Sequence, residues 1–381
     1  MKVAKVAIID HTESLDGRVH LLKHFFESKG IKTDVIMSDF SHYKKKKIIH
    51  AKKGYIYLHT IPYKKNVSVK RILSHIYFAK KVFHFLCQSN YDLVWVLLPP
   101  NSLLKEVVKA KKIKHFLLIG DVEDLWPESL PIQSDFLKRM LVFKYWKNLR
   151  NHNLQYADYV VTECEAYLPY LKKYIKSGRY TTLFLAKPSV SKIKDLSSKC
   201  SNILRVAYVG SINHIIDINS IQGIIERLSK IKKVEVVIIG DGESRQKLIE
   251  TLESIKNVQV HFYGKIFDER KKQSILRDCN MGINIMKESV VVGFTMKSLD
   301  YLRNGLLLLN NIHNDTWQLV EKYDIGINVG SSARFINQEV QRSFSLKQRN
   351  YIIDLYNNLF SEKSFFDNVN NICVKLGINT H

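Results

Sequence analysis

Hydrophobic and polar positions predict strands and helices in turn along the whole chain. Residues 3–9 form a continuous apolar run, typical of a strand buried on both faces of a parallel sheet. A helical pattern over residues 19–26 follows and ends at Gly30, before a second apolar run at residues 33–37. Further strands are predicted at 55–58, 93–98, 116–119 and 159–162. This alternation favours a doubly wound parallel sheet.

A second alternating set follows a polar stretch without strong periodicity, SVSKIKDLSSKCSN, which we interpret as a linker at residues 189–202. Strands are expected at 204–209, 234–239, 258–262, 281–285, 306–309 and 326–329. The sequence therefore predicts an α/β protein with two Rossmann-like doubly wound domains facing across a cleft, the usual place for a ligand. We place the domains at residues 1–188 and 203–360, and expect a C-terminal helix within 361–381 that packs back on the first domain.

Glycine placement narrows the class of α/β protein. The segment after the first strand, DHTESLDGRV, has one glycine, whereas a dinucleotide fingerprint needs three, and no GxxxxGK[ST] loop occurs. We therefore expect no NAD, FAD or P-loop nucleotide site and no cofactor apart from the substrates. Gly17 and Arg18 are expected in a diphosphate or acceptor loop, because they open a helix whose free amides can face an anion, although a lone glycine there is more often only a turn.

Length and cysteine content agree with a protein of two cores in a reducing compartment. The 381 residues are 45% hydrophobic, and the five cysteines are scattered without CxxC spacing, so neither a disulfide framework nor a zinc site is expected. The opening MKVAKVAIID is not typical of a signal peptide, and residues 82–98 are too short and too polar to span a bilayer. These features predict a cytoplasmic protein.

Positive charge is concentrated in the first half. Residues 1–187 hold 33 Lys and Arg against 16 Asp and Glu, while the remainder holds 26 against 20. Residues 41–115 alone hold 17 basic residues against Asp92 and Glu106. An AT-rich genome accounts for many lysines but less well for the asymmetry. A basic face that binds an anionic surface, either lipid or nucleic acid, explains the asymmetry more specifically.

The segment GINIMKESVVVGFTMKSLDYLRNG, at residues 282–305, carries the clearest chemistry. A helix is expected to start after Thr295, a good N-cap, and to end near Gly305. Lys297 lies in its first turn and Asp300 three residues on. Free amides and a lysine suit a diphosphate, and a carboxylate one turn deeper can accept ribose hydroxyls. The alternative is an ordinary ion pair between Lys297 and Asp300 on a solvated helix.

This segment resembles the donor-binding region of family 4 glycosyltransferases, which have the GT-B fold. The resemblance extends to LRVAYVGSI, VVIIGDGESRQKLIE and VQVHFYGK, in the family's order, and to GDVEDLWPES at residues 120–129, similar to bacterial members that build surface polysaccharides. It implies a retaining, metal-independent hexosyltransferase, with a donor site that includes Gly293, Thr295, Met296, Lys297 and Asp300. Gly210, Ser211 and Lys265 are expected in the same site, although the family's Gly-Arg and following lysine are missing at residues 210–216, its first glutamate falls on Val292, and Asp300 replaces a glutamate.

Four acidic residues follow the predicted strand at 116–119: Asp121, Glu123, Asp124 and Glu128. One of them could serve as the general base toward an acceptor, because crowded like charges raise a carboxyl pKa. Asp124 and Glu128 match the family motif directly and rank before Glu123. A metal site and a solvated turn are the alternatives. His11, His20, His24 and His214 are more typical of packed or exposed residues than of catalysts.

The resemblance implies transfer of a sugar from a UDP- or GDP-type donor to a glycan acceptor, in bacterial capsule, O-antigen or exopolysaccharide assembly. A lipid-linked acceptor requires work at the bilayer, so we expect peripheral attachment to the inner face of the cell membrane. Residues 44–47, 52–53, 64–65, 70–71 and 80–81 supply charge, and Tyr43, Tyr55, Tyr57, Tyr63, Tyr77 and Phe78 are candidate anchors. The alternatives are a nucleotide-sugar epimerase of the same fold and a basic nucleic-acid-binding protein, although no RNA-binding signature accompanies the lysines.

Overall fold

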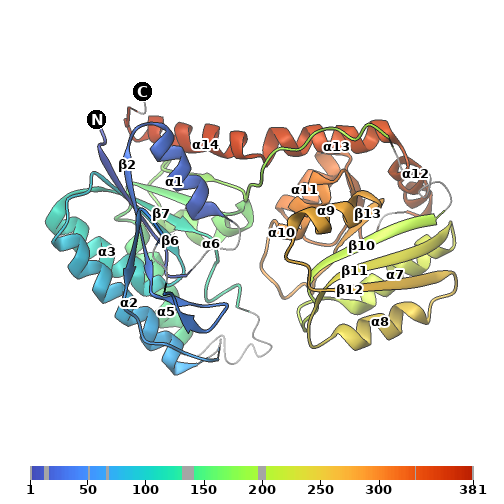
Figure 1. Cartoon of the computed structure of the whole chain (residues 1–381), viewed down its shortest axis with the longest axis horizontal. Coiled ribbons are helices and arrows are strands. Elements are labelled where there is room, and N and C mark those ends of the chain that lie inside the picture. Colours follow the sequence, from blue (N-terminus) through green and yellow to red (C-terminus); the bar gives the residue numbers. More distant parts are fainter. Residues whose placement is uncertain are drawn as a thin grey trace. The chain divides into compact units, whose positions relative to one another are not determined.

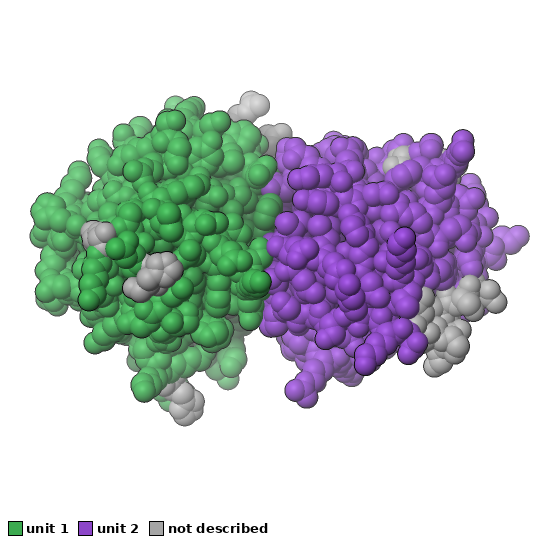
Figure 2. Space-filling model, turned by 90° about the horizontal axis from the view of Figure 1, so that it is seen from above, with its two compact units in different colours: residues 1–186, 362–381 green, residues 187–361 purple. Residues whose placement is uncertain are grey.

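The computed structural model describes residues 2–12, 17–49, 52–65, 68–130, 141–195, 203–330 and 332–379. Its chain divides into two compact units, Met1–Ala186 with Glu362–His381, and Lys187–Ser361 (Figure 2). Part of the predicted linker, residues 196–202, lies outside the described residues. No helix of the described part is long and apolar enough to cross a membrane.

The first unit is built on a seven-stranded parallel sheet in the order β5-β2-β1-β6-β7-β8-β9 (Figure 1). Its strands are β1 (Lys5–Ile9), β2 (Lys32–Ser38), β5 (Tyr55–Leu58), β6 (Leu93–Leu98), β7 (Leu117–Val122), β8 (Tyr159–Thr162) and β9 (Tyr180–Thr182). The six predicted strands are confirmed. Sequence reasoning missed β9 and the small antiparallel pair β3 (Phe40–Ser41) and β4 (Lys46–Lys47), which are too short to show a period.

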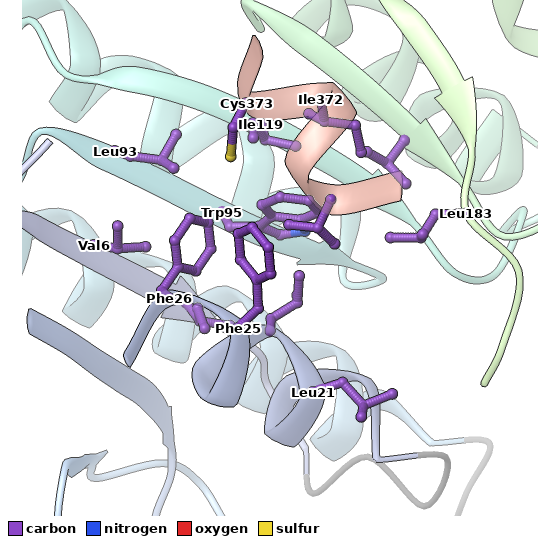
Figure 3. Close-up of a cluster of buried hydrophobic side chains, with 14 of the residues drawn as sticks. Val6, Leu21, Phe25, Phe26, Leu93, Trp95, Ile119, Leu183, Ile372 and Cys373 are labelled. Carbon is purple, nitrogen blue, oxygen red and sulfur yellow. The ribbon is translucent and has the colours of Figure 1, made fainter. Parts of the chain in front are cut away.

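Helices cover both faces of this sheet. They are α1 (Arg18–Ser28), α2 (Val69–Cys87), α3 (Asn101–Lys114), α5 (Leu141–Leu154), α6 (Leu168–Leu171) and α14 (Glu362–Lys375), with 3-10 turns at Glu165–Tyr167 and Lys172–Tyr174. Helices α1 and α14 bury Phe25, Phe26 and Ile372 against Trp95 on one face (Figure 3). On the other face, Gly120 of β7 lies close to side chains of α3 and α5. Because each buried aromatic or aliphatic side chain contributes about 1.5–3 kcal/mol, α14 is an integral part of this core.

The second unit holds a six-stranded parallel sheet in the order β12-β11-β10-β13-β14-β15. Its strands are β10 (Ile203–Ser211), β11 (Lys233–Asp241), β12 (Val258–Gly264), β13 (Met281–Asn284), β14 (Leu307–Asn310) and β15 (Gly326–Asn328). Its helices are α7 (Ile218–Ser229), α8 (Arg245–Glu253), α9 (Glu269–Arg277), α10 (Met296–Arg303), α11 (Asp315–Tyr323), α12 (Ala333–Ser343) and α13 (Leu346–Leu359). All six predicted strands are confirmed, and so is the doubly wound α/β class.

Both sheets reverse their winding direction at one point. In the first unit the reversal lies between β1 and β6, and in the second between β10 and β13. Ligands of open α/β sheets bind at the carboxyl ends of the strands beside such a point. These two edges are therefore the places to look for functional side chains.

Candidate functional site

The carboxyl end of β10 closes tightly against β11. Gly240 pairs with Gly210 in the parallel register, and a Cβ on Gly240 would lie 1.9 Å from the Gly210 carbonyl oxygen. Gly210 itself has a φ of 118°, which favours glycine. Ser211, the last residue of β10, is exposed. The backbone at this predicted donor position is therefore open to an approaching ligand.

Helix α10 begins as the sequence predicts. Thr295 is its N-cap, with the side-chain oxygen accepting a hydrogen bond from the Ser298 amide at 3.3 Å. The preceding loop is fixed from two sides: Thr316 donates to the Gly293 carbonyl through its hydroxyl at 2.6 Å, and the Phe294 ring stacks on Phe360 at 4.6 Å. Met296 is the first residue of the helix and is partly buried. The free amides of this first turn therefore have a defined position.

A chain of three buried asparagines connects the sheet edge to this helix start. Asn284, Asn310 and Asn328 are the last residues of β13, β14 and β15, and they are register partners. Asn284 donates to Asn310 at 3.0 Å, and Asn310 donates to Asn328 at 2.8 Å. The Thr295 hydroxyl donates to the Asn284 side-chain oxygen at 2.9 Å. Sequence reasoning missed this chain, although each strand pattern ends in asparagine: GIN, LLN and GIN.

Lys297 carries an unneutralised charge at the beginning of α10. The side chain is partly buried, and its Nζ lies 4.8 Å from the centre of the Tyr208 ring of β10. Burial lowers the pKa of Lys297 to about 8. Within the part of the chain that the structure describes, Lys297 has no carboxylate at ion-pair distance. An anionic ligand at this place would compensate the cost of burying the charge.

Asp300 is held by two other lysines. The Lys187 ammonium lies 2.6 Å from Oδ1 of Asp300, the Lys272 ammonium lies 3.0 Å from Oδ2, and Asp300 itself is 5% exposed. Glu269 joins the same network through Lys272 at 2.6 Å. The alternative of an ion pair between Lys297 and Asp300 on a solvated helix is therefore wrong. Lys265 is exposed after β12, and no described contact brings it to α10.

The Arg18 side chain, predicted with Gly17 in a diphosphate or acceptor loop, is buried in the first unit. The guanidinium is 1% exposed and forms two hydrogen bonds to Asp121, of 2.9 and 2.8 Å, and a third to the Leu183 carbonyl at 2.8 Å. Trp95 also donates to Asp121 at 2.8 Å. Gly17 precedes the helix with a φ of 80° and gives it no side-chain cap. Arg18 and Asp121 are thus a buried structural pair.

Glu128 does not show the raised pKa that crowding of like charges at residues 121–128 predicts. Both oxygens of Glu128 accept hydrogen bonds from Arg150, at 2.9 and 2.8 Å, and Lys147 lies 3.2 Å away. Burial alone would raise the pKa of Glu128, but the hydrogen bonds and charge of Arg150 outweigh it and lower the pKa. A general-base role for Glu128 is therefore not supported. The sequence could not show this because Arg150 is 22 residues away along the chain.

Glu123 and Asp124 differ in their surroundings. A Glu123 oxygen lies 3.7 Å from Arg18, and the side chain is partly buried. Asp124 is exposed. Burial lowers the pKa of Arg71 and raises that of Tyr167, and the negative charge of Asp124 acts to raise both. No group of three His, Cys, Asp or Glu side chains among the described residues is placed to hold a metal ion. Asp124 is the accessible carboxylate of the predicted acceptor motif.

The predicted histidines fall into two groups. His20 and His24 are exposed on α1, and His214 lies beside Glu243 at 3.0 Å. His11 is buried after β1, with its ring 4.4 Å from that of His75. Burial, with the charges of Arg71 and His42, lowers the pKa of His11 to about 3, so it is neutral at ordinary pH.

No protein-family model matches this sequence, and no curated protein sequence matches it. Solved structures do match. Anabaena Alr3699/HepE in complex with UDP-glucose is similar over 98% of this chain and 99% of its own, with 13% sequence identity and a TM-score of 0.61. The apo form of the lipopolysaccharide outer core galactosyltransferase WaaB matches over 98% and 99%, with 14% identity and a TM-score of 0.64.

The chain has the GT-B fold. A Listeria monocytogenes protein named as a UDP-N-acetylglucosamine 2-epimerase is also similar, over 99% of this chain and 97% of its own, with 12% identity and a TM-score of 0.61. Identities of this size establish the arrangement of strands and helices alone. The chemistry of this GT-B chain must therefore be inferred from its own residues.

Substituting Asn310 by Leu should loosen the start of α10. The change leaves the side-chain amide of Asn284 without its acceptor inside the protein, which costs about 1–3 kcal/mol. We expect a loss of unfolding free energy in urea of that order. The matched control is Asn257→Asp, at an exposed turn of the same unit, which should change stability by less than about 0.5 kcal/mol. Equal stability of both variants would show that the asparagine chain does not fix this edge.

Proposed function

We propose that this protein is a glycosyltransferase that moves a sugar from a nucleotide diphosphate to an acceptor. The observation that carries the proposal is Lys297, a partly buried cation without a carboxylate partner among the described residues, at the free amides of α10 beside the reversal point of a parallel sheet. A diphosphate fits this position, because its negative charge compensates the charge of Lys297 and its oxygens accept hydrogen bonds from the helix amides.

The donor is proposed to be a UDP-sugar. HepE binds UDP-glucose in its solved complex and is similar over nearly its whole length, which supports a uridine nucleotide over a guanine one. Gly210, Ser211, Gly293 and Thr295 are proposed to surround the diphosphate. Asp300 is proposed to bind the ribose, using the lone pairs that its two lysines leave open. The proposed hexosyl transfer is retaining and metal-independent.

An epimerase remains the second candidate, favoured by the similarity to the Listeria protein. The two functions differ in their products. A transferase releases UDP only when an acceptor is present, whereas an epimerase makes a new nucleotide sugar without one. Incubation of radiolabelled UDP-glucose and UDP-N-acetylglucosamine with and without acceptor, followed by chromatography, separates them.

Lys297→Met should weaken UDP binding roughly 10–100-fold, because it removes a charge-assisted hydrogen bond to the diphosphate. The free protein should become more stable by about 1–2 kcal/mol at pH 7, because a desolvated charge is lost. The pKa of Lys297 is lowered to about 8 from 10.5, so the unfolded chain holds more protons between these values and wild-type stability rises with pH there. The stabilising effect of the substitution should therefore shrink between pH 8 and 10.5.

Calorimetry with UDP and urea unfolding measure the two effects. Lys287→Met is the matched control, since Lys287 is exposed in the same unit and its removal changes the net charge equally. UDP binding by Lys297→Met with the wild-type affinity would remove the basis of the donor proposal.

Asp124 is proposed as the group that accepts the proton of the acceptor hydroxyl. Asp124→Asn should leave UDP affinity unchanged and lower the transfer rate roughly 100-fold. Glu128→Gln is the contrast, since breaking its pair with Arg150 should lower stability while the folded protein still transfers sugar. A wild-type transfer rate for Asp124→Asn, measured as UDP release, would show that Asp124 is not the general base.

The acceptor is proposed to be a lipid-linked glycan of bacterial surface polysaccharide, capsule or lipopolysaccharide, with the first unit on the acceptor side. WaaB, a lipopolysaccharide outer core galactosyltransferase, supports the class of pathway by its similarity. Peripheral attachment to the cytoplasmic face of the membrane would bring the enzyme to such an acceptor. Nucleic acid is not among the proposed partners.

Two of the six membrane anchors that the sequence indicates are buried, whereas Tyr43 is 52% exposed. Tyr63 and Phe78 are buried, at 2% and 0% exposure, because both pack into the core. Val69, Leu73 and Ile76 are also exposed, at 72%, 48% and 39%, on one face of α2. Positions i, i+4 and i+7 share a helix face, and exposed lysines of α2 flank it. An apolar stripe with basic neighbours suits an anionic bilayer.

Val69→Ser with Leu73→Ser should weaken binding to phosphatidylglycerol vesicles roughly 100-fold or more in co-sedimentation, because the transfer of each apolar side chain out of water contributes about 1.5–3 kcal/mol. Binding should also fade as salt rises. Phe267→Ser, at an exposed apolar residue of the second unit, should have no effect. Equal binding of wild type to neutral and anionic vesicles would contradict the proposed attachment.

A further inference from the structure

A basic cavity of about 420 Å³ lies in the first unit, between the β3–β4 pair and the start of α2. Its volume falls within the range of small-molecule sites. Its polar lining consists of the side chains of Lys45, Tyr63, Lys64, Lys65, Ser68 and Lys70, and Phe40 and Pro62 complete it. Four of these side chains are lysines and none is acidic.

The cations around this cavity outnumber the anions that could neutralise them. Lys64, Lys65 and Lys70 are exposed and form no ion pair with any residue that the structure describes. Helix α2 starts at the rim with Ser68 as its N-cap, and its first turn contains no acidic residue. A helix N-terminus beside basic side chains repels cations and favours an anion. The helix is 19 residues long, so its dipole is fully developed.

The inner wall of the cavity is preformed. Tyr63 is buried, and its hydroxyl lies 2.7 Å from Nδ1 of His42. The Lys45 ammonium lies 4.9 Å from the Tyr63 ring centre, and the Arg71 guanidinium lies 5.9 Å from it on α2. Burial, with the charges of Arg71 and Lys45, lowers the pKa of His42 to about 4. The histidine is thus neutral, and the positive potential comes from the lysines and Arg71.

We propose that this cavity binds a phosphate or diphosphate group of the acceptor. The inference rests on the proposed transferase function and specifies its acceptor: a sugar attached to a phosphate, either a soluble phosphate ester or a lipid diphosphate. Lysine ammonium groups bind phosphate as point charges, and the Ser68 rim adds backbone donors. The exposed Val69 and Leu73 stand beside Ser68 and Lys70 on the same helix, where the chain of a lipid-linked acceptor would meet apolar surface.

Titration of inorganic pyrophosphate by calorimetry, with the protein first saturated with UDP, tests this site. UDP occupies the donor site, so further saturable binding reports a second site. The variant Lys64→Ser with Lys70→Ser should lose at least tenfold in pyrophosphate affinity. Lys172→Ser with Lys173→Ser is the matched control, because it removes two exposed lysines of the same unit that lie outside α2 and the cavity, and it should stay within about twofold of wild type.

A second arm distinguishes the source of the phosphate. Phosphatidylcholine vesicles with and without polyprenyl diphosphate are compared in co-sedimentation. Binding that requires the diphosphate lipid, and that the Lys64 and Lys70 variant loses, supports a lipid acceptor, and pyrophosphate binding without vesicle binding supports a soluble one. Absence of both, or equal losses in the two double variants, overturns the proposal. If UDP itself does not bind in the first titration, the transferase function fails instead.

Discussion

The hydrogen-bonded chain Asn284, Asn310 and Asn328 is the interaction on which the proposed donor site depends. Parallel strands bring their carboxyl ends to one edge, and an asparagine amide both donates and accepts, so three of them in register form a continuous chain. The chain ends at Thr295, the N-cap of α10. The position of the helix amides is thereby tied to the sheet.

Tyr301 fixes the other side of the same helix. Its hydroxyl accepts from the Val209 amide at 2.8 Å and donates to the Ile283 carbonyl at 3.1 Å. A Cβ on Gly282 would lie 2.2 Å from the Tyr301 ring, so only glycine permits this close packing. Thr295 and Tyr301 both anchor α10 to the sheet, so the backbone of Lys297 between them has a fixed position.

The distribution of charge around α10 gives this geometry its chemical meaning. Asp300 forms ion pairs with Lys187 and Lys272, and Lys297 has no carboxylate partner among the residues described. The arrangement keeps a cation whose burial is compensated when a diphosphate binds, as is typical of binding sites that sacrifice stability.

Much of the fold could be predicted because it depends on local patterns. Apolar runs showed twelve of the strands, and Thr295 with Gly305 showed the limits of α10. The charged residues could not be assigned in the same way. Arg18 meets Asp121 across 103 positions of the chain, and a charge that is paired at such a distance looks the same in sequence as a free one. The asparagine chain required the strand register, which periodicity does not give.

The central claim is that Lys297 has no compensating anion in the free protein and binds a diphosphate. Proton uptake on UDP binding tests this claim most directly. Calorimetry at pH 8 in two buffers of different ionisation enthalpy measures the uptake. Because the pKa of Lys297 is about 8 in the free protein, the account predicts uptake of about half a proton by wild type and none by Lys297→Arg, which stays charged. Tight UDP binding without any proton uptake by wild type would contradict it.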